Sequence, residues 1–327
     1  MEEHRYTKDD IMYFPISGVE TSPFIPVAVA FVISIFTSMG GVSGAFVLLP
    51  FQVSVLGFVS PAVSSTNLVY NIIAIPGGVY RYFREGRMAW PIVWVTVAGT
   101  LPGVFVGAVL RIKYLPGPDN FKIFAGCVLL YIAFRLLYDF IPAAIENAKS
   151  DLDKCLKKSS VSANKSDMPP PGKDRVISAG RFSIISCSYK FYGETFSFNP
   201  IWLFLLTLAV GIAGGIYGIG GGAIIAPFLI TVFRLPVYTI AGAALFGTFL
   251  TSIVGVIFYT VIAPAYVHTG LAIVPDWQLG ALFGVGGLVG TYCGARLQKY
   301  FPAKAIKLLL GFVILFIATK YILGSMI

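Results

Sequence analysis

The sequence predicts an all-α, polytopic membrane protein with eight to ten membrane segments, built from two pseudo-symmetric halves. Three observations lead to this fold class. Of the 327 residues, 57% are hydrophobic and 12% are charged, whereas a soluble domain carries about 25% charged residues. Several apolar runs reach the roughly 20 residues that cross a bilayer. A glycine cluster followed by a Pro-Phe pair occurs once in each half.

Eight apolar runs are predicted to be membrane helices, and they fall into two sets of four. The runs are 24–57, 60–80, 88–110, 121–141, 200–233, 237–263, 277–297 and 303–324. The chain therefore divides into an N-terminal tail (1–23), a first membrane repeat (24–141), a linker loop (142–199) and a second membrane repeat (200–327).

The first run of each half is too long for one ordinary span at 1.5 Å per residue, and a glycine cluster interrupts it. The clusters are 40–44 (GGVSG) and 218–222 (GIGGG). Because glycine destabilises a helix interior, we expect each run to form two short helices, which gives five membrane segments per half. An odd number makes the repeats inverted, whereas four segments per half would make them parallel.

The basic residues of the loops favour the inverted arrangement. Loop 81–87 carries three of them and its counterpart 264–276 carries none, while the loop after the third run carries two in the first half and three in the second. Inverted repeats place six of these residues on one side and two on the other, whereas parallel repeats leave three and five. Cytoplasmic loops are enriched in Lys and Arg, so we expect inverted repeats and a cytoplasmic linker.

Further residues occupy matching positions in the two halves. Pro50-Phe51 corresponds to Pro227-Phe228, and glycines at 99, 103 and 107 correspond to glycines at 286, 290 and 294. Small residues at every fourth position let two helix backbones approach closely, so both glycine series predict helix packing. This ordered agreement favours a duplication over chance similarity among apolar helices.

The linker is rich in lysine at first and then contains Pro169-Pro170-Pro171-Gly172. Between Arg175 and Phe198, apolar and polar residues alternate around Tyr192-Gly193-Glu194. This alternation fits a small β-hairpin, and a disordered loop is the equal alternative.

Composition argues against nucleic-acid binding, a metal centre and an enzyme. The net charge of +9 comes mainly from the linker and the segment ends, where it suits the positive-inside rule and contact with anionic membrane lipid. The four cysteines contain no CxxC motif and show no metal-ligand spacing. We expect them to be small buried residues and free loop thiols. The apolar runs contain no paired carboxylates, so we expect no cofactor and no catalytic centre.

The two glycine breaks are the best candidates for a binding site. A helix that begins inside the membrane has unpaired amide N–H groups and the positive end of the helix dipole, which attract anions. Inverted repeats would bring two such ends, at Ala45 and Ala223, together near the midplane. Hydroxyls of Ser43 and Tyr217 would add donors. No charged residue lies in the middle of a run, so dipoles and hydroxyls are expected to hold the anion.

Polar residues in the second run of each half are expected to face inward, because polar groups are costly toward lipid. Asn67 and Asn71 lie on a broad face with Tyr70, and each of them has an alternative role as interhelical glue. The candidate substrate-binding residues are Gly40, Gly41, Ser43, Gly44, Thr66, Asn67, Asn71, Tyr217, Gly218, Gly220, Gly221, Gly222 and Thr248.

The two motifs resemble the sulfite exporter TauE/SafE family: GGVSGAFVLLPF is followed by SPAVSSTNL, and GIGGGAIIAPF by AGAALFGTF. The resemblance covers 24–141 and 200–324. It implies a bacterial inner-membrane transporter of sulfur-containing anions such as sulfite, sulfoacetate or other organosulfonates, with its site at the two breaks. The half-sites differ chemically, since Asn67 and Asn71 stand where the second half has Ala244 and Thr248.

Export of such an anion is the expected function, because an interior-negative potential drives anions outward. Two alternatives stay open. One is a transporter of another small organic anion such as a carboxylate, which backbone N–H groups also bind. The other is a membrane assembly subunit without transport activity, with the linker binding a partner. The oligomeric state, a homo-oligomer included, is also left open.

Overall fold

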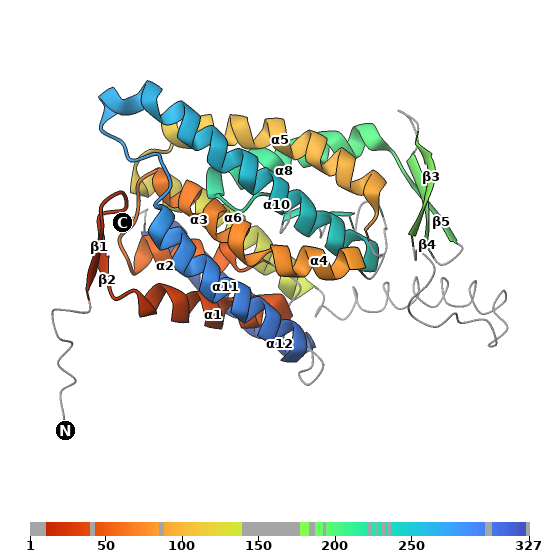
Figure 1. Ribbon diagram of the computed structural model, residues 1–327, viewed down its shortest axis with the longest axis horizontal. Coiled ribbons are helices and arrows are strands. Elements are labelled where there is room, and N and C mark those ends of the chain that lie inside the picture. Colours follow the sequence, from red (N-terminus) through yellow and green to blue (C-terminus); the bar gives the residue numbers. More distant parts are fainter. Residues whose placement is uncertain are drawn as a thin grey trace.

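The computed structural model describes residues 11–39, 43–84, 88–138, 177–182, 187–191, 194–221, 224–225, 228–229, 233, 237–297 and 303–324. In this part of the chain, long helices run lengthwise beside one another, and a small β-sheet lies at each end of the bundle (Figure 1). Large apolar side chains such as Trp94, Phe134 and Phe316 are exposed on the outside of the bundle, as expected for helices that contact lipid.

The helices of the first half are α1 (Phe24–Met39), α2 (Ala45–Ser54), α3 (Ala62–Ala74), α4 (Pro76–Arg84), α5 (Trp90–Lys113) and α6 (Pro118–Tyr138). The first apolar run forms two helices separated at its glycine cluster, as predicted. The run 60–80 also divides, which was not anticipated. A proline ring clashes with the carbonyl of the preceding turn, so α3 ends before Pro76 and α4 begins there.

The helices of the second half are α8 (Pro200–Tyr217), α10 (Val237–Ile262), the 3₁₀ helix η2 (Ala263–Thr269), α11 (Trp277–Leu297) and α12 (Ala303–Gly324). The predicted second break is confirmed, because α8 ends at Tyr217. Among the described residues, four helical stretches are long and apolar enough to cross a membrane: Trp90–Lys113, Pro118–Tyr138, Pro200–Tyr217 and Gly242–Thr269.

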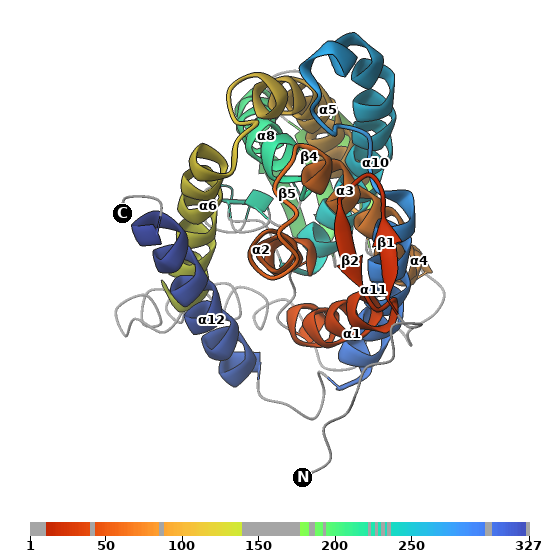
Figure 2. The same cartoon turned by 90° about the vertical axis from the view of Figure 1, so that its left-hand side faces the viewer.

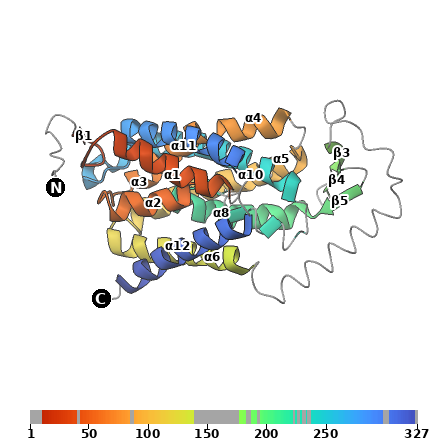
Figure 3. The ribbon, with the colours of Figure 1, turned by 90° about the horizontal axis from the view of Figure 1, so that it is seen from below.

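Two small antiparallel sheets flank the bundle. β1 (Met12–Phe14) and β2 (Val19–Thr21) form a hairpin that the sequence did not predict. In the linker, β3 (Ile177–Phe182), β4 (Cys187–Phe191) and β5 (Glu194–Phe198) form a three-stranded sheet, so the predicted hairpin is confirmed and gains a strand. The β1–β2 hairpin and the C-terminal end of α12 lie at one end of the bundle, and the linker sheet lies at the other (Figure 3).

The first helix of each half packs along the glycine-rich helix of the other half. α1 contacts α11, and α8 contacts α5 (Figure 2). A side chain at any of the three glycines of the α5 series would collide with the backbone of α8. The three glycines of the α11 series face α1 in the same way. The predicted helix-packing role of both series is confirmed, and its cause is the close approach of the backbones.

α3 lies at the centre of these contacts. It packs against α2, α8, α10 and α11, and nearly all of its side chains are buried. α6 and α12 pair with each other on one side of the bundle (Figure 2). One expectation about charge was wrong: Arg111, counted as a loop residue from the sequence, lies inside α5 and is wholly buried.

Candidate functional site

Two asparagines of α3 join the glycine breaks of the two halves. Asn67 and Asn71 lie one helical turn apart and are wholly buried. The Asn67 side-chain amide donates to the Ala45 carbonyl of the first break (3.0 Å) and to the Gly218 carbonyl of the second (3.1 Å). The Asn71 amide donates to the Ile219 carbonyl at 3.1 Å. We call this meeting point the break junction. The two breaks therefore meet at α3, whereas Ala223, the predicted helix start of the second half, lies outside the described residues.

At the first break, Ser43 directly precedes Gly44, which is the N-cap residue of α2. The Ser43 Oγ accepts from the Ala45 N–H (3.3 Å) and donates to Asn71 Oδ1 (3.2 Å). The Gly44 carbonyl accepts the N–H of Val47 at 3.1 Å. The expectation of unpaired amides starting at Ala45 is therefore wrong for Ala45 itself, because the hydroxyl of Ser43 occupies that N–H.

Three hydroxyl groups surround Gly44. Ser34 Oγ and Tyr70 Oη share a hydrogen bond of 2.8 Å. A Cβ atom on Gly44 would lie 3.2 Å from Ser34 Oγ and 3.3 Å from Thr37 Oγ1, and still closer to Tyr70 Oη. The absence of a side chain at Gly44 therefore lets α1, α2 and α3 meet here. The sequence analysis did not select Ser34 and Thr37 as site residues. The one feature that could have indicated them is a hydroxyl side chain within an apolar run.

The second break is built from glycines in the left-handed region. Gly218, Gly220 and Gly221 have φ angles of 82°, 73° and 81°, which glycine adopts at little cost. Gly218 ends α8 and donates its N–H to the Gly214 carbonyl at 2.8 Å. A Cβ atom on Gly218 would lie 2.8 Å from Ser64 Cα. This glycine therefore allows α8 to turn directly against the backbone of α3.

α10 covers the second break. Thr251 Oγ1 donates to the Gly220 carbonyl at 2.7 Å. Ser252 Oγ is buried beside Gly220 and has no hydrogen-bond partner among the described residues. Within the same described part of the chain, the amides of Gly220 and Gly221 have no acceptor. Unpaired donors therefore remain on this side of the break junction.

Tyr217 and Gln52 close the junction on the side of α2. The buried Tyr217 hydroxyl donates to the Phe46 carbonyl at 2.7 Å, so in this state it is committed to the first break. The Gln52 side-chain amide donates to Asn67 Oδ1 at 3.3 Å, and Gln52 Oε1 has no partner in the described structure. Sequence reasoning missed Gln52, although a lone amide side chain inside an apolar run was a usable signal.

Some predicted site residues make their contacts elsewhere. Thr66 Oγ1 accepts the N–H of Asp276 at 2.8 Å, next to the start of α11. Thr248 Oγ1 donates to the Ala244 carbonyl of its own helix at 2.8 Å, and its methyl group faces Gly220. The predicted site residues Gly40, Gly41 and Gly222 lie outside the described residues.

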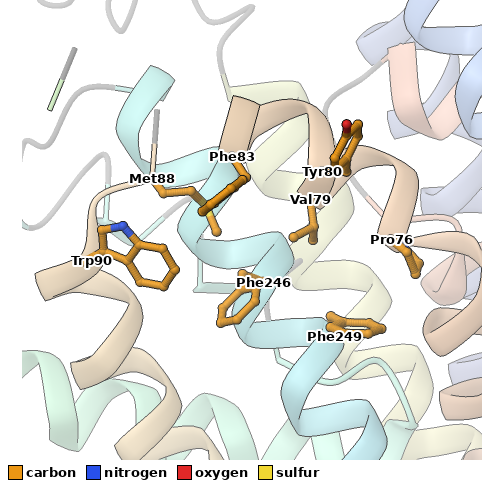
Figure 4. A pocket seen from close by; sticks show the side chains of 8 residues that line it. All are labelled: Pro76, Val79, Tyr80, Phe83, Met88, Trp90, Phe246 and Phe249. Atoms are coloured by element: carbon orange, nitrogen blue, oxygen red, sulfur yellow. The ribbon is translucent and has the colours of Figure 1, made fainter. Parts of the chain in front are cut away.

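A groove between α4 and α10 differs from the junction in its chemistry. It is lined by Pro76, Val79, Tyr80, Phe83, Met88, Trp90, Phe246 and Phe249 (Figure 4). Its surface is almost entirely nonpolar, so it offers an anion no cluster of donors. Within the described residues, no group of His, Cys, Asp or Glu side chains is arranged to hold a metal ion. The break junction therefore has the polar chemistry that an anion requires.

Comparison with known proteins identifies one family. The family model described as "Sulfite exporter TauE/SafE" matches residues 26–321, a range that includes both glycine breaks, α3 and α10. The resemblance seen in the two motifs is thereby confirmed. No curated protein and no solved structure matches the chain.

Proposed function

The chain belongs to the sulfite exporter TauE/SafE family, and we propose from this premise that it exports sulfite or a small organosulfonate such as sulfoacetate through the break junction. Membership implies a multi-pass membrane transporter of sulfur anions rather than an enzyme. The anion is held by backbone N–H and hydroxyl donors of the two breaks.

The observation that carries this proposal is the set of unpaired donors at the second break. The amides of Gly220 and Gly221 and the hydroxyl of Ser252 lie together and lack acceptors among the described residues. A buried polar group without a partner costs about 1–3 kcal/mol. An oxyanion with several oxygens would satisfy these donors, whereas a ligand without acceptor atoms would not.

We also propose that the two halves are inverted repeats. Reciprocal packing supports this: α1 lies on α11, and α8 lies on α5. The helices after the two breaks start alike, since Gly44 accepts from Val47 and Gly221 accepts from Ile224, each at 3.1 Å. In transporters of this kind, the substrate binds where the repeats meet, and one repeat rocks against the other. Movement at the break junction would then expose the anion to each side in turn.

The direction of transport follows from the membrane potential. We place the end that carries the linker sheet in the cytoplasm of a bacterial cell, because the basic loops gather there under the inverted arrangement. An interior-negative potential favours the exit of an anion by about 2.3 kcal/mol per charge per 100 mV. Facilitated efflux at the inner membrane therefore requires no coupled ion.

Flux measurements in proteoliposomes test the proposal. Purified protein is reconstituted at a set potential, and the movement of labelled sulfite is compared with that of two matched pairs, methanesulfonate with acetate and sulfoacetate with malonate. We expect sulfite and at least one sulfonate to move toward the positive side. Transport of the carboxylates alone would replace this proposal with the carboxylate alternative, and transport of none of these anions at either polarity would refute it.

A further inference from the structure

Arg111 is a buried cation that the proposed transport site does not use. It lies in the last turn of α5 and is wholly buried. Its Nη2 donates to the Val59 carbonyl at 2.9 Å. Its guanidinium carbon lies 3.7 Å from the ring centroid of Phe121. These contacts fix its position but satisfy only part of its hydrogen-bonding capacity.

Two nitrogens of the Arg111 guanidinium have no hydrogen-bond partner in the described part of the chain. Within the described residues, Nε and Nη1 make no hydrogen bond, and no carboxylate forms a salt bridge with the guanidinium. Ser60, which directly follows Val59 in the chain, has a buried hydroxyl that is also unpartnered there. A buried charge is ordinarily paired, because removing it from water is costly. Arg111 and Ser60, in the region where the end of α5 meets the segment before α3, thus have hydrogen-bond donors without an acceptor among the described residues. We call this region the Arg111 corner.

Residues of α5 and α10 lie between the Arg111 corner and the second break. Tyr259 of α10 belongs to the same hydrophobic cluster as Ala108 and Ile112, which lie beside Arg111 in α5. The Tyr259 hydroxyl donates to the Gly215 carbonyl at 3.1 Å. Ser64 Oγ donates to the Ile216 carbonyl at 2.8 Å, two residues before Gly218. The C-terminal end of α5 lies at the end of the bundle where β1 and β2 lie (Figure 1).

We propose that Arg111 and Ser60 form a second binding station for the transported oxyanion, between the break junction and this end of the bundle. Nε provides one N–H donor and Nη1 provides two, and the positive charge matches an anion. Charge-assisted hydrogen bonds are about twice as strong as neutral ones, so this station would attract the anion from the more weakly binding dipoles of the junction. The inference rests on the proposed function of the chain as an anion transporter.

Binding of labelled sulfite to the purified full chain tests this station, with Arg111→Gln as the main variant. We expect wild-type protein to bind two sulfite ions per chain and R111Q to bind one, with flux reduced at least tenfold at low sulfite. Lys113→Gln is the matched control, because it removes an exposed positive charge from the same helix end. We expect K113Q to retain wild-type binding and flux.

The effect of anions on thermal stability distinguishes a role of Arg111 in anion binding from a purely structural role. Sulfite should raise the melting temperature of wild-type protein, and R111Q should lose the part of this rise that belongs to the second site. Wild-type stoichiometry and wild-type anion dependence in R111Q would overturn the inference. If R111Q does not fold, Arg111→Lys and Ser60→Ala replace it as test variants. Each should weaken sulfite binding at one of the two sites at least threefold. An unchanged sulfite affinity in both variants would overturn the inference.

The outcome for wild-type protein distinguishes this inference from the proposed function. A wild-type chain that neither binds nor carries any sulfur anion would refute the proposed function itself. If the wild-type chain transports sulfite, and R111Q, R111K and S60A bind and transport sulfite as the wild type does, only the second station is refuted.

Discussion

The two glycine breaks follow one backbone plan and are held in place by different means. At the first break, side chains make most of the contacts: Ser43 accepts the Ala45 N–H, and the hydroxyls of Ser34 and Tyr70 surround Gly44, whose φ of −66° is ordinary. At the second, Gly218, Gly220 and Gly221 take left-handed φ angles, and the break contributes little side-chain chemistry of its own. In both, the carbonyl of one glycine accepts the N–H groups three and four residues further along the chain.

This difference shows that an interrupted helix is specified in two ways. At the first break, the Ser43 hydroxyl occupies the Ala45 amide. At the second, Gly218 donates its N–H to Gly214, whereas the amides of Gly220 and Gly221 have no acceptor among the described residues. The first break is therefore better suited to holding the junction together, and the second is better suited to contacting the anion. The following predictions test this division.

The largest effect is expected for Gly218→Ala. The new Cβ would meet the backbone of Ser64, and the φ of 82° disfavours any side chain. We expect a loss of more than about 4 kcal/mol in the free energy of unfolding and the loss of transport, measured by thermal or denaturant unfolding in detergent and by flux. Gly270→Ala is the matched control, since Gly270 has a φ of 68° and open space around it, so its cost should be about 1–2 kcal/mol. Equal costs would show that close packing at the second break is unimportant.

The next largest effect is expected for Asn67→Leu. The substitution leaves the Gly218 carbonyl without its donor and the Gln52 amide without its acceptor, at about 1–3 kcal/mol for each. We expect about 2–4 kcal/mol of destabilisation and at least a tenfold loss of flux. Ser65→Ala, which removes a buried α3 hydroxyl bonded to Ile273, should cost about 1 kcal/mol and leave flux unchanged. Wild-type flux in N67L would mean that the junction need not be tied together.

Gly221→Ala should separate binding from stability. A Cβ atom there has room, with Thr100 Cγ2 as the nearest atom at 3.4 Å, but the φ of 81° is unfavourable. We expect a cost of about 1–2 kcal/mol and at least a tenfold loss of sulfite flux, because the amide is displaced. Gly44→Ala forces a Cβ atom against the hydroxyls of Tyr70 and Ser34, so it should destabilise the protein more than Gly221→Ala. If the second break contacts the anion, Gly44→Ala should nevertheless lower the flux per folded molecule less. The reverse order would assign the anion to the first break.

The smallest effect is expected for Ser43→Gly, which gives the first break the glycine found at the matching position of the second. The substitution removes the hydrogen bonds of the Ser43 hydroxyl to the Ala45 amide and to Asn71 Oδ1. It also frees the Ala45 amide. We expect a loss of about 1 kcal/mol in the free energy of unfolding and a modest gain in sulfite affinity, measured by equilibrium binding. A large fall in affinity would show that the Ser43 hydroxyl contacts the anion directly.

Several features of this protein were readable from particular residues. The position of each break followed from its glycines, since their effect on a helix is local. Close helix packing of α5 and α11 followed from glycines spaced four apart, because this spacing exposes backbone along one helix face, but the sequence did not identify the partners α8 and α1. For the linker, the alternation that ends at Phe198 left a hairpin and a disordered loop equally open, and the structure has a three-stranded sheet. The break between α3 and α4 at Pro76 also has a local cause, the proline itself, but the sequence analysis did not predict it.

By itself, the sequence determined that the chain is a multi-pass membrane transporter of the TauE/SafE family, because hydrophobicity, glycine spacing and motif order are local properties of the chain. The tertiary structure alone decided which polar groups are occupied. It committed the Tyr217 hydroxyl to Phe46, bonded Ser17 beside β1 to Asp276, and buried Arg111 with no counter-charge among the described residues. Such pairings join residues far apart in the chain, and a hydrogen bond across that separation leaves no periodic pattern in the sequence.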